Sequence, residues 1–178
     1  MLVNKGNVGK IAERIVMNEL QFRGYQTTDL NKDGLRANAD ILASKDGKVW
    51  QIQVKGATNT PTGRWWVQYG HCDPDILSGK AKVFNRKESF YSAAYVALVA
   101  VRSPSEYRCF ILPVAKAEKI AQLGLDRGYR EPKRDGSEHK PGKMWTVVER
   151  SDKDRTRDPR LNKEREILQS GENQWNLL

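Results

Sequence analysis

The stretch that decides the fold runs from residue 39 to residue 56 and reads ADILASKDGKVWQIQVKG. Asp46-Gly47 lies in its middle, and Asp-Gly is a favoured central pair of the type I′ turn that joins two antiparallel strands. The flanking segments, residues 39–44 and 49–54, are rich in the apolar and β-branched residues typical of strands. The sequence therefore predicts a β-hairpin here.

The turn also sets the register of this hairpin. With Asp46 and Gly47 as the two central turn residues, Asp40 faces Gln53, and Lys55 follows two residues later on the same face. An acid, an amide and a lysine thus converge on one polar face. The other face is apolar and is expected to be buried. Its members are Ala39, Ile41 and Ala43 on the first strand and Trp50, Ile52 and Val54 on the second.

The segment before the hairpin has the spacing of an amphipathic helix. Apolar residues recur every three or four positions between residues 8 and 22, and Gly24 follows as a helix stop. Glu13 lies at the edge of the apolar stripe, one turn after Gly9, whose missing side chain leaves space for a close neighbour. Glu13 is therefore a candidate to add a second carboxylate to the polar face.

The rest of the chain predicts a mixed sheet with flanking helices. The expected strands are residues 25–29, 64–69, 94–102 and 107–114, and the expected helices are residues 115–123 and 159–169. This order favours a mixed-sheet α/β or α+β domain over a doubly wound parallel one. We expect residues 1–124 to form the core and residues 125–178 to form a basic loop and a C-terminal extension that packs on it.

The composition limits the classes of function. Lys and Arg number 31 against 22 Asp and Glu, which gives a net charge of +9, and the chain has five Trp and six Tyr. This balance suits a nucleic acid, because cations release counterions from phosphates and aromatic rings stack on bases. Charge that serves only solubility is the alternative, and composition leaves both open.

The sequence also predicts a soluble, cytoplasmic protein with no membrane partner. No apolar run has the length of a membrane span, and no apolar signal region precedes the first helix. Cys72 and Cys109 are too few for a disulfide scaffold and too far apart for a paired metal motif. We expect both to be reduced thiols.

The polar face of the hairpin suits metal-dependent hydrolysis of a phosphodiester. Asp40 offers an anionic oxygen and Gln53 an amide oxygen, which a hard ion such as Mg²⁺ accepts beside water and substrate phosphate. Lys55 would orient a metal-bound water and shield the charge that grows on the phosphate. The alternative is an ordinary solvated strand face, with Glu13 a solvent-facing helical acid.

These residues together resemble a nuclease family. Gly9-Lys10-Ile11-Ala12-Glu13, Ala39-Asp40 and Gln53-Val54-Lys55-Gly56 resemble the motifs of the PD-(D/E)xK nuclease superfamily. The likeness is strongest to its Gln-x-Lys members among homing endonucleases, and the layout is similar to that of Holliday-junction resolvases. Ala39 stands where proline is common, and Gln53 replaces the usual acidic ligand. The resemblance covers roughly residues 5–56.

The resemblance implies a restriction-endonuclease-like core, with four to five strands in a mixed sheet flanked by helices. It implies a Mg²⁺-dependent endonuclease acting on duplex or branched DNA, with Mn²⁺ able to substitute for Mg²⁺. Glu13, Asp40 and Gln53 would be the metal ligands and catalytic residues, together with Lys55 as the catalytic cation. Small nucleases of this kind often act as dimers, so a homodimer is one implied assembly.

Several basic and aromatic residues are candidate contacts to DNA. They are Lys10 on the first helix, Arg64 and Trp65 after the hairpin, and Arg130, Lys133 and Arg134 in a charged loop. Core packing of the tryptophan and simple solvation of the loop are the alternatives. Two rival functions also stay open: a catalytically inactive nuclease-fold module that binds nucleic acid, and a structural or protein-interaction factor.

Overall fold

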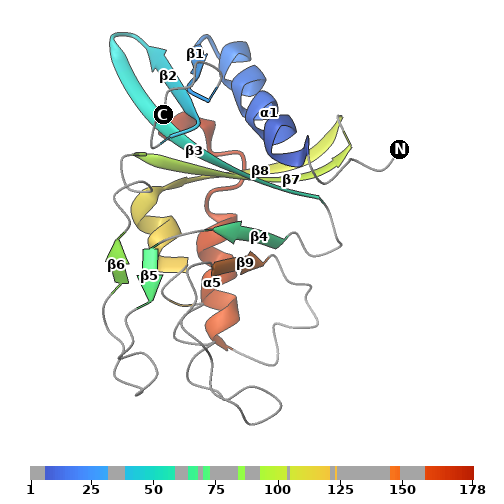
Figure 1. Cartoon of the computed structure of the whole chain (residues 1–178), viewed down its shortest axis with the longest axis vertical. Helices are drawn as coiled ribbons and strands as arrows, with labels where there is room; N and C mark the ends of the chain where they lie inside the picture. The colour runs from blue at the N-terminus through green and yellow to red at the C-terminus, as the bar shows by residue number, and fades with distance from the viewer. Residues whose placement is uncertain are drawn as a thin grey trace.

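A mixed five-stranded sheet forms the centre of the molecule in the computed structural model (Figure 1). The structure describes residues 7–31, 39–58, 64–67, 70–72, 84–86, 93–103, 105–120, 123, 145–148 and 159–178. The sheet order is β1 (Gln26–Asp29), β2 (Ile41–Lys45), β3 (Lys48–Thr58), β7 (Tyr95–Ser103) and β8 (Glu106–Pro113). Only the β3 and β7 pair is parallel. The predicted α+β class with a mixed sheet is confirmed.

The hairpin of β2 and β3 has the predicted register. Ala43 pairs with Trp50, and Lys45 pairs with Lys48 next to the turn. Asp46 and Gly47 have φ values of 51° and 76°, the left-handed conformations that a type I′ turn requires. The strand β3 is longer than predicted because β7 runs parallel to it as far as Thr58, which continues the hydrogen bonding after β2 has ended.

Helices and two small ribbons complete the described fold. The helices are α1 (Val8–Phe22), a helical segment at 114–120, α5 (Pro159–Gln169) and the 3-10 turn η3 (Trp175–Leu177). The ribbons pair β4 (Arg64–Val67) with β9 (Trp145–Val148) and β5 (Gly70–Cys72) with β6 (Phe84–Arg86). The predicted helices at 8–22 and 159–169 are confirmed. None of the helices that the structure describes has the length and hydropathy to cross a bilayer.

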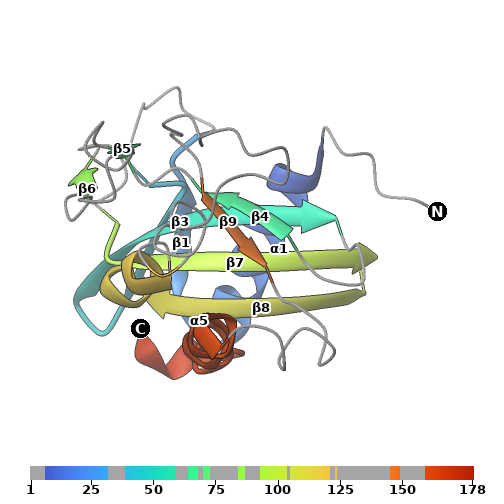
Figure 2. The same cartoon turned by 90° about the horizontal axis from the view of Figure 1, so that it is seen from below.

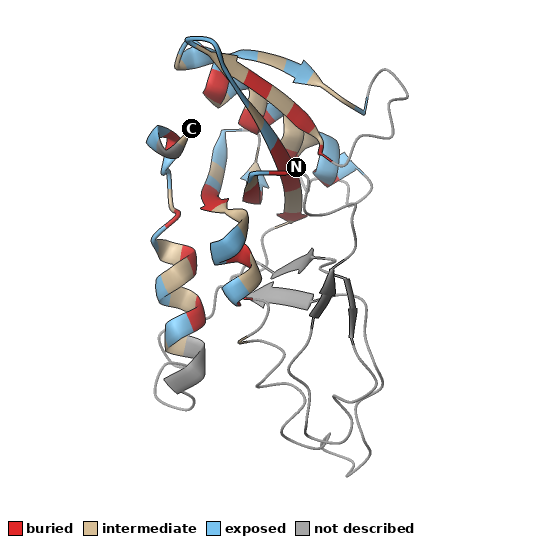
Figure 3. Ribbon diagram, turned by 90° about the vertical axis from the view of Figure 1, so that its left-hand side faces the viewer, coloured by how far each residue is buried: buried red, intermediate tan, exposed pale blue. Residues whose placement is uncertain are grey.

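The central strands are buried on both faces. Ala97, Val99 and Val101 of β7 join the apolar core beneath α1, while Val96 and Leu98, which alternate with them, are also fully buried. Figure 3 shows this burial along the strands, and Figure 2 shows β3, β7 and β8 side by side. Burial on both faces explains why the sequence of β7 is almost continuously apolar.

The helix α1 lies directly on β3 because Gly56 has no side chain. A Cβ at Gly56 would lie 2.7 Å from the carbonyl oxygen of Val8 and 2.8 Å from the Cβ of Ala12. Among the described residues Gly9 has no such neighbour, since none of their atoms lies within 4 Å of a Cβ built there. The described residues therefore supply no close neighbour at Gly9, and the glycine that permits the close approach of α1 is Gly56 on the strand.

The C-terminal segment covers the outer edge of β8. The N–H of Ile111 donates to the carbonyl of Gly171 at 2.7 Å, and the N–H of Asn173 donates to the carbonyl of Cys109 at 2.9 Å. The side chain of Trp175 then enters the core and is only 4% exposed. The end of the chain thus packs against the sheet. The division at residue 124 stays a prediction, because residues 124–144 lie outside the described residues.

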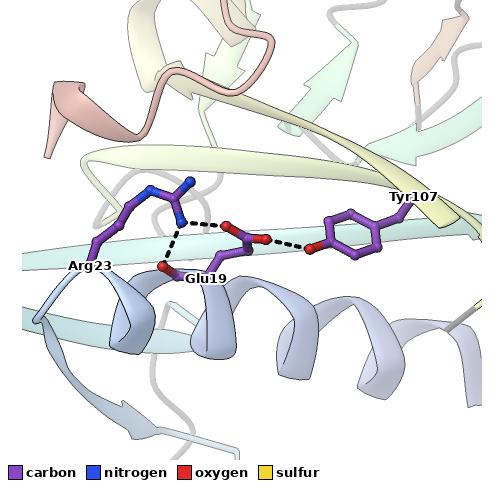
Figure 4. A network of polar contacts seen from close by, with 3 residues as sticks. All are labelled: Glu19, Arg23 and Tyr107. Carbon is purple, nitrogen blue, oxygen red and sulfur yellow. Dashed lines mark hydrogen bonds and ion pairs between the residues drawn. The ribbon is translucent and has the colours of Figure 1, made fainter. Parts of the chain in front are cut away.

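A polar network joins α1 to β8 (Figure 4). The hydroxyl of Tyr107 donates to one carboxylate oxygen of Glu19, and Arg23 donates to the other oxygen and, at 2.8 Å, to the carbonyl of Glu19. The bond to Glu19 raises the pKa of Tyr107 to about 12, and the same bond lowers the pKa of Glu19. The guanidinium of Arg23 also lies 4.9 Å from the ring centre of Trp175.

The close contact at Gly56 predicts that Gly56→Ala destabilises the fold by about 1–3 kcal/mol, the range for overpacked interiors. The added methyl group meets the backbone of α1 at Val8, which cannot turn aside as a flexible side chain would. Urea unfolding measures the change. Gly9→Ala is the matched control and should cost no stability, because its methyl group enters open space. Equal stability of Gly56→Ala and wild type would contradict the close contact.

The network of Glu19 predicts a pH dependence of stability. The pKa of Tyr107 is raised on folding, so its bond contributes fully below the ordinary tyrosine pKa near 10 and is lost as the pH rises toward about 12. Tyr107→Phe should lower the free energy of unfolding at neutral pH by about 1 kcal/mol and flatten the alkaline loss. Thermal unfolding across this pH range measures both effects. An identical alkaline slope in the variant would show that Tyr107 does not titrate in this way.

Candidate active site

Asp40 lies immediately before β2, and its side chain extends the pairing of the hairpin. Its Oδ2 accepts the backbone N–H of Val54 at 2.7 Å and the side-chain amide of Gln53. Its own N–H donates to the carbonyl of Ile52, and its carbonyl accepts the N–H of Leu30, both at 3.0 Å. The predicted contact between Asp40 and Gln53 is confirmed, and the carboxylate is held in one orientation.

Asn31 links this carboxylate to α1. Its Nδ2 donates to Oδ1 of Asp40 at 2.9 Å and lies 3.4 Å from Oε1 of Glu13. The N–H of Asn31 donates to Oδ1 of Asp29 at 2.9 Å, which closes an Asx turn after β1. Sequence inspection missed Asn31, because only the pairing of Asp29 with Ile41 brings this turn beside Asp40. The local signal was the Asp-x-Asn spacing.

The charges of the predicted catalytic residues act on one another. Burial raises the pKa of Glu13, and the nearby carboxylates of Asp40 and Asp29 raise it further. The hydrogen bond from Asn31 and the positive charge of Lys55 work in the opposite direction, lowering the pKa of Glu13. The helix and the two hairpin strands therefore bring their ionisable groups to one place.

Polar and apolar residues alternate along β3 between the site and the apolar core. Ile52 and Val54 belong to the core under α1, and Gln53 and Lys55 alternate with them on the other face of β3. Gln53 is only 9% exposed, and the hydrogen bond from its amide to Asp40 offsets part of the cost of burying it. Trp50 is only partly buried, at the edge of the core where Tyr25 packs against it edge to face.

The donor atoms fit a hard divalent cation. Two carboxylates and an amide oxygen are available from Glu13, Asp40 and Gln53, and Mg²⁺ typically takes one or two carboxylates and keeps several waters. Within the described part of the chain, no three His, Cys, Asp or Glu side chains are arranged to hold a metal ion. An ion here would therefore depend on the amide oxygen and on water as well as on the two acids, whose mutual repulsion it would offset.

The structure describes only some of the residues predicted to contact DNA. Lys10 is exposed on α1. Arg64 and Trp65 are successive residues of β4, opposite Val148 and Val147 of β9, so their positions lie on opposite faces of this ribbon. Arg130, Lys133 and Arg134 lie outside the described residues. All six remain predictions as contacts to nucleic acid.

The sheet, with α1 across β3 and the polar cluster on its hairpin, is a nuclease-like fold. The solved structure of a bacterial homing endonuclease, I-Ssp6803I, is similar to the chain with a TM-score of 0.51 and 13% sequence identity. The similarity covers 98% of this chain and 92% of that chain. The sequence matches no protein-family profile and no curated protein. The comparison confirms the predicted fold, while membership of the PD-(D/E)xK superfamily stays a prediction.

The bonds of Asp40 predict that its carboxylate supports the fold. Asp40→Ala leaves the N–H of Val54 without its acceptor, and an unsatisfied buried donor costs about 1–3 kcal/mol. Asp40→Asn keeps an oxygen at that position and should cost less. Lys55→Ala serves as the control on the same face, with little expected change because Lys55 is not fully buried. Urea unfolding measures all three; equal stabilities for Asp40→Ala and Asp40→Asn would contradict the capping role.

Proposed function

We propose that this protein is a metal-dependent endonuclease that hydrolyses DNA phosphodiester bonds. The observation that carries the proposal is the cluster itself: Asp40 is bonded to Gln53 on the facing strand and is linked through Asn31 to Glu13. The charge of Lys55 acts on the same cluster. The likeness of the fold to a homing endonuclease supports the proposal.

Each residue has a distinct role in this proposal. Glu13, Asp40 and Gln53 would hold Mg²⁺ or Mn²⁺, and the bound ion would supply a water of lowered pKa and positive charge next to the phosphate. Asp40 is oriented for this task by the N–H of Val54. Lys55 orients the attacking water and stabilises the negative charge that develops on the phosphate oxygens.

The partner in this proposal is DNA, either duplex or branched, and a homodimer is one assembly that would act on it. The net charge of +9 supports a polyanionic partner. Lys10, Arg64, Trp65 and the three basic residues of the charged loop supply phosphate contacts and stacking. Phosphate contacts of this kind position the substrate without reading its sequence.

A catalytically inactive module that binds nucleic acid is the second candidate. The observation that favours it is the identity of Gln53, whose side-chain N–H bonds to Asp40 and which adds no negative charge to the site. A site with fewer charges attracts a cation less strongly. The same fold and the same basic surface would then serve binding alone.

Cleavage of plasmid, branched and single-stranded DNA with Mg²⁺ or Mn²⁺ tests the proposal. Lys55→Ala and Asp40→Asn should each lower the cleavage rate by about 100-fold or more, as loss of an acid–base or charge-stabilising group does. Lys48→Ala is the matched control, since Lys48 is an exposed lysine of the same strand far from the cluster. Circular dichroism checks that each variant is folded.

One outcome would change the assigned mechanism, and another would decide against the function. Wild-type cleavage by folded Lys55→Ala would remove Lys55 from the mechanism. No cleavage of any DNA by the wild type, combined with affinity for DNA that falls linearly with the logarithm of salt concentration, would establish the inactive binding module instead.

A further inference from the structure

We propose that Asn31 is a positioning residue of this site, which holds the carboxylates of Glu13 and Asp40 in the arrangement that receives the metal ion. The inference rests on the proposed metal-dependent function. Asn31 belongs to the turn after β1. The predicted ligands lie elsewhere, on α1 and on the β2–β3 hairpin.

One amide nitrogen serves both acids. Nδ2 of Asn31 lies 2.9 Å from Oδ1 of Asp40 and 3.4 Å from Oε1 of Glu13. The two carboxylate oxygens thus converge on a single donor, although one comes from α1 and the other from the hairpin. Like charges held this close repel, and a donated N–H is the attraction that keeps them together before an ion is bound.

Asn31 is itself fixed by its backbone. Its N–H donates to Asp29 at 2.9 Å, and the N–H of the preceding Leu30 donates to the carbonyl of Asp40 at 3.0 Å. The turn is therefore tied to Asp40 by a backbone bond as well as by the amide. A donor on an anchored turn can orient a partner, whereas a donor on a free loop would move with it.

The two acids depend on Asn31 to different extents. Oδ2 of Asp40 already accepts bonds from Val54 and Gln53, so that carboxylate stays oriented without Asn31. Glu13 is a longer side chain, and among the described residues its hydrogen bond comes from Asn31. Loss of Asn31 should mainly free Glu13, and ordering that side chain then opposes metal binding.

Calorimetric titration of the intact protein with Mn²⁺, without DNA, tests the role. Asn31→Ala should raise the dissociation constant for Mn²⁺ by about tenfold or more, the usual effect of removing a group that orients a metal ligand. Single-turnover cleavage at saturating Mn²⁺ should stay within about threefold of wild type, because the bound ion then supplies the ordering. The thermal midpoint without metal should hardly change, since Asn31 is exposed.

Asn18→Ala is the matched control, because Asn18 is an exposed asparagine on α1 one turn and a half beyond Glu13. It should leave both the dissociation constant and the rate unchanged. Asp40→Asn, which changes a proposed ligand, should weaken Mn²⁺ binding and so locate the ion at this site. If it does, and Asn31→Ala binds Mn²⁺ as tightly as wild type or more tightly, the positioning role is overturned. If the wild type binds no Mn²⁺, the proposed function itself fails and the inference falls with it.

Discussion

The double pairing of β3 is the constraint on which the rest of the structure depends. This strand bonds antiparallel to β2 on one side and parallel to β7 on the other. Its two faces then have separate tasks: Ile52, Val54 and Gly56 receive α1, while Gln53 and Lys55 form the polar cluster with Asp40. Because successive residues alternate between faces, a shift of one residue in register would exchange the core and the site.

Local patterns predicted the strands of the central sheet and the helices α1 and α5, whereas the placement of other features depends on long-range pairing. The Asp46-Gly47 turn fixed the hairpin register, because a type I′ turn leaves one geometry for its neighbours. The periodicity of α1 is equally local. Asn31 could not be found in this way, since β1 must first pair with β2. The ribbon of β4 and β9 joins residues about eighty positions apart, and no local signal matches them.

The contact between α1 and β3 shows the limit of reasoning from a glycine in sequence. Gly9 lies in the predicted helix and Gly56 just after the predicted strand, and the sequence does not say which one meets a neighbour. The answer depends on the angle at which the helix crosses the sheet. That angle is set by the packing of many side chains throughout the core. The same holds for the site: the ligand types could be predicted from the hairpin, but the bonding of Asp40 to the N–H of Val54 could not.

The C-terminal strap over β8, residues 171–175, bears on how the protein is made. An open strand edge offers unpaired N–H and C=O groups to any other extended chain. Ile111 and Cys109 find their partners in Gly171 and Asn173, and Arg108 is joined to Glu172 by two bonds of 2.9 Å. The ribosome produces these partners long after β8, so a nascent chain exposes this edge during translation. Newly made protein is therefore prone to aggregate through this edge until the strap has been synthesised and pairs with β8.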